Sequence, residues 1–241
     1  KGTPQGGIIS PTLANMTLDG LEQAIINAVP RRVRVNFIRY ADDFIVTGKS
    51  KMIIERNIIP VIVEFLATRG LELSEGKSKI TYIKNGFTFL GQTFRKTGNK
   101  LHIKPSKEGM LSLIRELGMI IRKHTNASMI ILIKKLNEKL RGWANYHRHV
   151  VASQAFKRVD TFVYEQLWRM IHRRHQNRSK TWLAKKYWLA FGRRWLFSAS
   201  YLTKKGKKKI MSVIRICSIG IRRHRKIKAD ANPYLAEYGS Y

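Results

Sequence analysis

Residues 33–46 carry the sequence VRVNFIRYADDFIV. Apolar and polar residues alternate before the acidic pair and an apolar run follows it, a pattern typical of two half-buried strands joined by a tight turn. The turn would place Asp42 and Asp43 at its tip. We therefore predict a β-hairpin that presents two carboxylates, within a region that mixes helices and strands.

Adjacent aspartates can simply favour a turn, but the composition makes this pair unusual. The chain has five aspartates among 241 residues and a formal net charge of +32. Phosphoryl transfer to a nucleotide uses divalent cations, and Mg²⁺ prefers carboxylate oxygens held on a rigid support. We interpret Asp42 and Asp43 as candidate metal ligands and predict Mg²⁺ as the cofactor.

Helices and further strands are predicted around the hairpin. Ser10 and Pro11 form a helix start, and the preceding Gly6-Gly7 pair either lets the backbone approach a ligand closely or is an ordinary entry to the helix. The apolar spacing predicts a helix over residues 11–29, a helix over 53–69 that is kinked or restarted at Pro60 and ended by Gly70, and strands over 79–83 and 87–94.

The pattern after Pro105 has the helical period for about seventy residues. Three apolar stripes, within residues 110–121, 129–147 and 156–170, predict a small three-helix bundle. From about Arg178 the sequence is irregular and very basic. Apolar stretches at 195–202 and 210–219 flank the lysine-rich residues 204–209, which suggests a hairpin with a cationic turn.

Charge and composition indicate a nucleic-acid partner. Residues 1–100 carry 15 basic and 8 acidic groups, whereas residues 101–241 carry 32 and 7, so the second part is the stronger candidate for binding a polyanion. The single cysteine, Cys217, excludes an intramolecular disulfide and fits a reducing compartment. No apolar run is long enough to span a bilayer, and we expect a cytoplasmic or organellar protein.

Four ordered motifs resemble the later reverse transcriptase blocks of group II intron proteins. They are residues 2–15 (GTPQGGIISPTLAN), 40–43 (YADD), 73–77 (LSEGK) and 86–91 (GFTFLG). Their order and spacing are more specific than any single motif. The resemblance implies an α+β fold with part of a polymerase palm, an antiparallel sheet with helices, followed by a helical thumb bundle and a basic C-terminal region.

The resemblance also implies roles for individual residues in polymerisation. Asp42 and Asp43 would bind Mg²⁺, with Asp42 as the principal ligand. Lys77 would lie near the leaving pyrophosphate as a proton donor, although Gly76 stands where an acidic residue is expected. The residues expected to contact the incoming dNTP and the template are Gln5, Gly6, Gly7, Tyr40 and Ala41. The expected primer grip consists of Phe89, Leu90 and Gly91.

The helical part resembles the thumb or maturase domain of the same family at residues 142–146, 168–175 and 182–187. The resemblance there implies contacts with intron RNA and with the template–primer duplex. Cations on helices whose other faces are apolar would match the spacing of phosphates on a rigid scaffold. The predicted nucleic-acid-binding residues are Arg141, Arg148, Lys157, Arg158, Arg169, Arg173, Arg174, Lys185 and Lys186. The aromatic residues Trp143, Tyr146 and Trp168 are interpreted as packing residues.

These observations divide the chain into a palm part (1–100), a thumb or maturase domain (101–190) and a basic DNA-binding or connector region (191–241). The segment 221–234 resembles the connector that precedes an endonuclease module, but a single cysteine and dispersed histidines do not predict that module here. The family places a third catalytic aspartate before Gln5. Because the chain begins at Lys1 without an initiator Met, we expect it to be part of a longer polypeptide.

The predicted function is that of an RNA-directed DNA polymerase and intron maturase. Its expected partners are group II intron RNA, a DNA target, a template–primer duplex and dNTPs, while the oligomeric state is not predicted. The 241 residues alone are expected to bind nucleic acid and to polymerise poorly or not at all. Two alternatives are a non-enzymatic RNA-binding splicing cofactor that keeps the palm as a scaffold, and an unfolded remnant of a broken gene.

Overall fold

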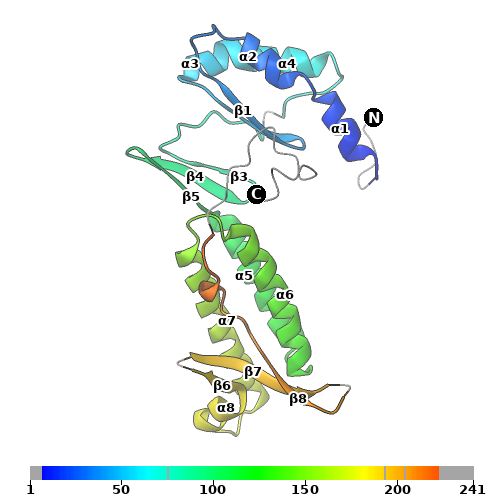
Figure 1. The fold of residues 1–241 in the computed structure, drawn as a ribbon, viewed down its shortest axis with the longest axis vertical. Coiled ribbons are helices and arrows are strands. Elements are labelled where there is room, and N and C mark those ends of the chain that lie inside the picture. The colour runs from blue at the N-terminus through cyan, green and yellow to red at the C-terminus, as the bar shows by residue number, and fades with distance from the viewer. Residues whose placement is uncertain (1–6, 75, 193, 204, 223–241) are drawn as a thin grey trace, which may run out of the picture. The chain divides into compact units, whose positions relative to one another are not determined.

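The computed structural model describes residues 7–74, 76–192, 194–203 and 205–222. The chain divides into two compact units, Lys1–Thr81 and Tyr82–Tyr241, and each contains its own hydrophobic core. Helices alternate with small antiparallel sheets (Figure 1), so the expected α+β class is confirmed. The division into three domains at residues 100 and 190 stays a prediction, and the boundary between the two units lies earlier, after Thr81.

The first unit combines a hairpin with short helices. Its elements are α1 (Ser10–Thr17), α2 (Leu21–Asn27), β1 (Asn36–Tyr40), β2 (Asp43–Thr47), α3 (Lys51–Ile53), the π-helical turn η1 (Ile54–Ile58) and α4 (Ile59–Ala67). Leu21, Ile25 and Ile58 are fully buried, and Phe37 and Phe44 of the hairpin pack against the same cluster. The hairpin predicted within residues 33–46 is confirmed, with Tyr40 paired to Asp43 across the turn.

Two helices were predicted in this unit, and the structure interrupts both of them. The single helix expected over 11–29 is wrong, because α1 ends at Thr17 and α2 begins at Leu21. Gly20 between them has φ +83°, a left-handed conformation that interrupts a helix. The interruption expected at Pro60 takes the form of the π-helical turn η1, after which α4 begins at Ile59, since proline lacks the N–H that would continue the α-helical bonding.

The second unit begins with a three-stranded antiparallel sheet in the order β3 (Phe87–Phe89), β4 (Gln92–Thr97) and β5 (Lys100–Pro105). The single strand predicted over 87–94 is wrong. Leu90 and Gly91 have φ +48° and +71°, as in a type I′ turn, and they fold that segment into a hairpin. Residues 79–83, predicted as a strand, form no strand in the described structure, where Tyr82 is 60% exposed.

Three long helices follow and confirm the predicted bundle. They are α5 (Lys107–Lys123), α6 (Met129–His147) and α7 (Ser153–Arg174), and Figure 1 shows them running alongside one another. The apolar stripes expected from the sequence form the core, in which Leu117, Leu140 and Val159 are fully buried. Each helix therefore buries one face and leaves the opposite face for charged residues.

The C-terminal part of this unit is a second three-stranded sheet with a helix. Its elements are α8 (Lys180–Tyr187), β6 (Trp188–Phe191), β7 (Arg194–Leu202), β8 (Lys208–Ser212) and the 3₁₀ turn η2 (Ile216–Ser218). The predicted hairpin with a lysine-rich turn is confirmed as β7–β8. The sequence reading missed α8, although Ser179 is a visible cap whose hydroxyl accepts a hydrogen bond from the Trp182 N–H at 3.2 Å.

A buried amide and a carboxylate join the C-terminal strands to the bundle. Asn137 of α6 donates to the Ser212 carbonyl at 2.8 Å and accepts from the Ile214 N–H at 2.9 Å. Asp160 of α7 accepts from the backbone N–H groups of Ile216 and Cys217, both at 2.9 Å. These side chains satisfy backbone groups that have no strand partner, so they fix the path of the chain across the helices.

Candidate functional site

The turn between β1 and β2 presents both predicted metal ligands to solvent. Ala41 and Asp42 form the turn, where Ala41 has φ +54°, and Asp43 is the first residue of β2. The side chains of Asp42 and Asp43 are exposed. Neither makes a hydrogen bond or ion pair with another residue of the described ranges, so their oxygens are available to an external ligand.

Arg39 fixes this turn from the inner face of the hairpin, and the sequence analysis did not single it out. Its guanidinium donates to the Asn15 side-chain oxygen at 3.0 Å and to the Ala41 carbonyl at 3.1 Å. Helix α1 is thereby tied to the turn that carries Asp42. The sequence could have indicated this role. Side chains two residues apart in a strand lie on the same face, so Arg39 shares the inward face of Phe37.

The other residues predicted to contact the nucleotide or to donate a proton differ in their exposure and in their distance along the chain from the aspartate turn. Tyr40 is 65% exposed, and because it pairs with Asp43, the two side chains occupy the same face of the hairpin. Gly7 is partly exposed at the start of the described chain, while Gln5 and Gly6 lie outside the described residues. Lys77 is exposed within a turn, and no hydrogen bond or ion pair of the described residues joins it to either aspartate.

The chemistry of the aspartate pair fits Mg²⁺. Mg²⁺ binds through one or two carboxylates and completes its shell with water and substrate phosphates, and Asp42 and Asp43 offer two exposed carboxylates at one turn. Within the described ranges no group of three or more His, Cys, Asp or Glu side chains could hold a metal ion. The hairpin could therefore supply two protein ligands to such a site, and metal binding by Asp42 and Asp43 stays a prediction.

The predicted primer grip is the type I′ turn between β3 and β4. The Leu90 carbonyl accepts a hydrogen bond from the Tyr146 hydroxyl at 2.7 Å, and the Gly91 carbonyl accepts from the Ser106 N–H at 2.9 Å. Tyr146 was interpreted as a packing residue, yet it is 50% exposed and acts through its hydroxyl. These bonds tie the turn to α6 and to the start of α5, so its position is set by the bundle.

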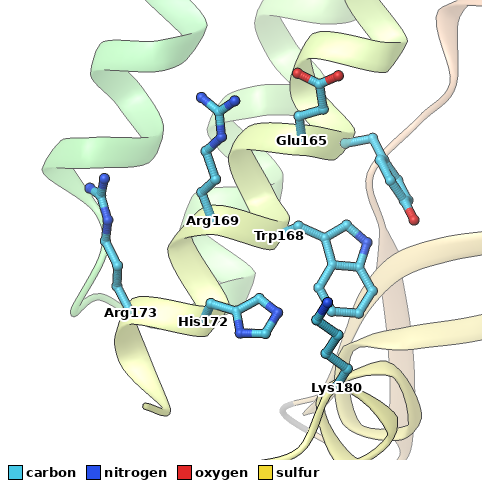
Figure 2. Close-up of a pocket in the computed structure, with 7 residues that line it drawn as sticks. Glu165, Trp168, Arg169, His172, Arg173 and Lys180 are labelled. Carbon is cyan, nitrogen blue, oxygen red and sulfur yellow. The ribbon is translucent and has the colours of Figure 1, made fainter.

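A groove along the outer face of α7 gathers several of the predicted cations. We call it the α7 groove; it has a volume of about 670 Å³ and is lined by Tyr164, Glu165, Trp168, Arg169, His172, Arg173 and Lys180. In Figure 2, Glu165, Arg169 and Arg173 extend from one side of α7 while Trp168 and His172 extend from another. The lining thus consists of two parallel stripes at a spacing of four residues, one aromatic and one charged.

The aromatic stripe rests on buried rings. Trp168 stacks on Trp188 with ring centroids 5.7 Å apart and an interplanar angle of 18°. Trp188 in turn meets the fully buried Phe197 edge-on at 5.6 Å. Trp168 was interpreted as a packing residue, and it does pack against the bundle core. It also lines the groove, so one side chain takes part in both the core and the surface.

Two of the nine predicted nucleic-acid-binding cations donate hydrogen bonds to backbone carbonyls of the described residues. Arg174 donates to the carbonyls of Thr125 and Ala127 at 3.3 and 3.0 Å, which closes the loop between α5 and α6. Arg148 is half-buried and donates to the Gly220 carbonyl at 3.5 Å. Arg174 is nevertheless exposed, as are the other seven, which are Arg141, Lys157, Arg158, Arg169, Arg173, Lys185 and Lys186. Nucleic-acid binding by any of the nine stays a prediction.

A second group of rings and cations lies where α7 meets α8. The charged groups of Arg178 and Lys186 lie 5.1 and 4.6 Å from the centre of the Trp182 ring, within the range of cation–π attraction. His175 contacts the Tyr187 hydroxyl at 2.6 Å. Burial, followed by the nearby charge of Lys186, lowers the pKa of His175, which favours the neutral ring beside these cations.

No helix of the described chain is both long enough and apolar enough to cross a membrane.

Two family models match consecutive parts of the sequence. Residues 1–94 match the reverse transcriptase (RNA-dependent DNA polymerase) model. Residues 110–188 match the model of the group II intron maturase-specific domain. The match covers most of α5, all of α6 and α7, and the whole of the α7 groove.

Individual relatives agree with these matches. The chain is 30% identical over 104 residues to the Ribosomal operon-associated A protein of Euglena gracilis, covering 41% of this chain and 18% of that protein. It is 28% identical over 167 residues to Protein YkfC of Escherichia coli (strain K12), covering 56% and 42% respectively, and 27% identical over 143 residues to Maturase-like protein 1 of Euglena longa, covering 58% and 29%. The chain therefore spans less than half the length of each of these relatives.

Proposed function

The chain belongs to the group II intron reverse transcriptase and maturase family, and from that premise we propose that its protein copies RNA into DNA and assists the splicing and mobility of an intron RNA. The proposed partners are the intron RNA, a template–primer duplex, a DNA target and dNTPs. Residues 1–100 would supply part of the palm, residues 101–190 the thumb or maturase domain and residues 191–241 a basic DNA-binding region. A cytoplasmic or organellar location fits this role.

Polymerase chemistry is supported by the exposed Asp42 and Asp43 at a turn that Arg39 ties to α1. Bound Mg²⁺ would polarise phosphoryl oxygens and neutralise charge that develops during transfer. The two carboxylates would hold the ion, and Tyr40, on the same face as Asp43, would contact the nucleotide or template. Lys77 as a proton donor and Phe89, Leu90 and Gly91 as a primer grip complete the proposal.

Intron binding is supported above all by the α7 groove, where Arg169 and Arg173 of α7 and Lys180 of α8 line one hollow, and the other face of α7 is buried. Such cations can meet successive phosphates without reorganisation of the scaffold. The exposed Arg141, Lys157, Arg158, Lys185 and Lys186 would extend this surface. The non-enzymatic splicing cofactor would use the same surface, so the two functions differ only in the need for Asp42 and Asp43.

The test of RNA binding is its dependence on salt. If six to ten phosphates are contacted, affinity for a structured RNA should fall about a thousandfold or more between roughly 50 and 200 mM salt, through counterion release. Filter binding at several salt concentrations would measure the slope of log K against log salt concentration. An affinity that stays flat over this range would contradict the proposal.

Single substitutions locate the contacts. Arg169→Ala and Arg173→Ala should each reduce the salt slope by about one unit while leaving the thermal melt unchanged. Lys100→Ala, at the exposed start of β5 in the same unit, is a matched control and should leave the slope as it was. An equal loss in all three variants would indicate diffuse attraction instead of a defined groove.

A further inference from the structure

Glu165 is an unexpected residue in the α7 groove. Its carboxylate lies at one end of the charged stripe, four and eight residues before Arg169 and Arg173. Glu165 is exposed and forms no ion pair or hydrogen bond with another described residue. A carboxylate repels phosphate and accepts hydrogen bonds, so a ligand that combines phosphates with a hydrogen-bond donor would suit this mixture of Glu165 with cations better than a phosphate alone.

The lining has the three kinds of group that hold a single unpaired nucleotide. Tyr164, 49% exposed, and Trp168 offer rings, and unstacked bases bind to such rings with little regard to sequence. Arg169, Arg173 and Lys180 can bind the flanking phosphates. A volume of about 670 Å³ lies within the range of small-ligand sites, which is about 300–1,000 Å³. Trp168 is held between neighbours, because it stacks on Trp188 and its ring centroid lies 5.6 Å from that of His172.

The carboxylate distinguishes the four bases by their Watson–Crick edges. A carboxylate only accepts hydrogen bonds, and guanine presents two neighbouring donors, N1–H and N2–H₂, that fit its two oxygens. In cytosine and adenine one amino donor lies beside an acceptor nitrogen, and in uracil a single N–H lies between two carbonyls. Guanine therefore gains two hydrogen bonds where each of the other bases gains one and meets repulsion.

We propose that the α7 groove binds one unpaired guanosine of an RNA, with the base against the aromatic stripe, its N1–H and N2–H₂ groups on the Glu165 carboxylate, and the flanking phosphates on Arg169, Arg173 and Lys180. The inference deepens the proposed function, because it rests on RNA binding by this groove. In this proposal Glu165 selects the base, whereas the cations bind phosphates and so contribute affinity that does not depend on the RNA sequence.

The experiment compares RNA hairpins that are identical except for one bulged nucleotide. Fluorescence anisotropy with labelled hairpins bearing a bulged G, A, C or U should show about fivefold or greater preference for G, the lower end of what a bidentate base contact supplies. A bulged inosine, which lacks the N2 amino group, should lose most of that preference. Equal affinity for all the bulges would overturn the inference.

Two conservative variants complete the test. Glu165→Gln keeps the size of the side chain but replaces one acceptor with a donor, so G should lose its preference and inosine should bind as G does. Glu138→Gln, an exposed carboxylate on α6, should keep the full preference for G. A preference for G that persists in Glu165→Gln would show that another group reads the base, which contradicts the assignment.

The failure of this inference is distinguishable from the failure of the proposed function. Arg173→Ala should weaken binding of all the hairpins by a similar factor and leave the preference for G in place. If the hairpins bind with a steep salt dependence but without preference, the cationic groove stands and the guanosine site is wrong. If none of them binds with a steep salt dependence, the proposed RNA-binding function itself is wrong.

Discussion

The β1–β2 turn and the α7 groove present charged side chains by different means. Asp42 is placed by a two-residue turn and by the hydrogen bonds of Arg39 to its neighbour Ala41 and to α1. Arg169 and Arg173 are placed by a helix of 22 residues whose other face is buried in the bundle core. A turn positions one or two groups, whereas a packed helix repeats a group every four residues. The first suits a compact ion, the second an extended polyanion.

The largest effect that this comparison predicts is the loss of DNA synthesis without loss of RNA binding. In the full polypeptide encoded by the gene, Asp42→Asn should lower Mg²⁺-dependent dNTP incorporation on poly(rA)/oligo(dT) by about a hundredfold or more, because metal binding contributes several kcal/mol to transfer. The affinity for RNA should change by less than about twofold.

The control for this experiment is Asp19→Asn, which removes an exposed carboxylate from the same unit and should leave incorporation unchanged. Splicing assistance that survives Asp42→Asn would separate the maturase activity from the polymerase activity. Incorporation that survives Asp42→Asn would remove Asp42 from the metal site and favour the non-enzymatic splicing cofactor.

A smaller effect concerns acid stability and belongs to the second unit. His147 is 3% exposed between the rings of Trp143 and Tyr146, and burial, with a contribution from His149, lowers its pKa from 6.5 to about 4. Between these values the unfolded chain binds a proton that the folded chain excludes. Stability is therefore complete above pH 6.5 and falls as the pH approaches 4, by up to about 3 kcal/mol.

Urea unfolding at pH 7.5, 6, 5 and 4.5, followed by circular dichroism, would measure this dependence. His147→Leu keeps an apolar group of similar size in the core and should flatten the curve over that range. His102→Leu, a partly exposed position on β5, serves as the comparison and should retain the slope of the unchanged protein. An undiminished slope in His147→Leu would assign the acid sensitivity to other groups.

The smallest effect separates two neighbouring arginines. Arg174→Ala removes the hydrogen bonds to the Thr125 and Ala127 carbonyls and should lower stability by about 1 kcal/mol, since this side chain is exposed and the bonds are partly replaced by water. Arg173→Ala should leave stability within about 0.5 kcal/mol and lower RNA affinity. Thermal melts and binding at fixed salt would show the two losses, and identical profiles would contradict the division of roles.

The hairpin and the bundle were predictable because their signals are local. Alternation within residues 33–46 and apolar spacing in α5, α6 and α7 follow directly from strand and helix periods. The turn at Leu90–Gly91 was missed because leucine rarely adopts φ above zero. The strand predicted at 79–83 is wrong. The local sequence alternates as in a strand, but the described structure provides no neighbouring strand with which these residues could pair.

The candidate site was predictable as a set of residues but not as an arrangement. The sequence indicated Asp42, Asp43 and the cations of α7, since residue type and helical spacing are enough to name them. It did not indicate Arg39, whose partner Asn15 lies 24 residues away along the chain. It also left Glu165 unremarked, because an isolated acidic residue has meaning only when the surrounding groove is known.

The sequence by itself determined the family, the excess of positive charge in residues 101–241 and the acidic turn. Each of these depends only on residue types and their order along the chain. Only the tertiary structure decided which cations have protein partners and which face solvent. Arg173 and Arg174 are adjacent and chemically identical, yet packing brings the α5–α6 loop to Arg174 alone. A guanidinium bonds to whatever carbonyls lie within its reach, and folding of the chain sets that reach.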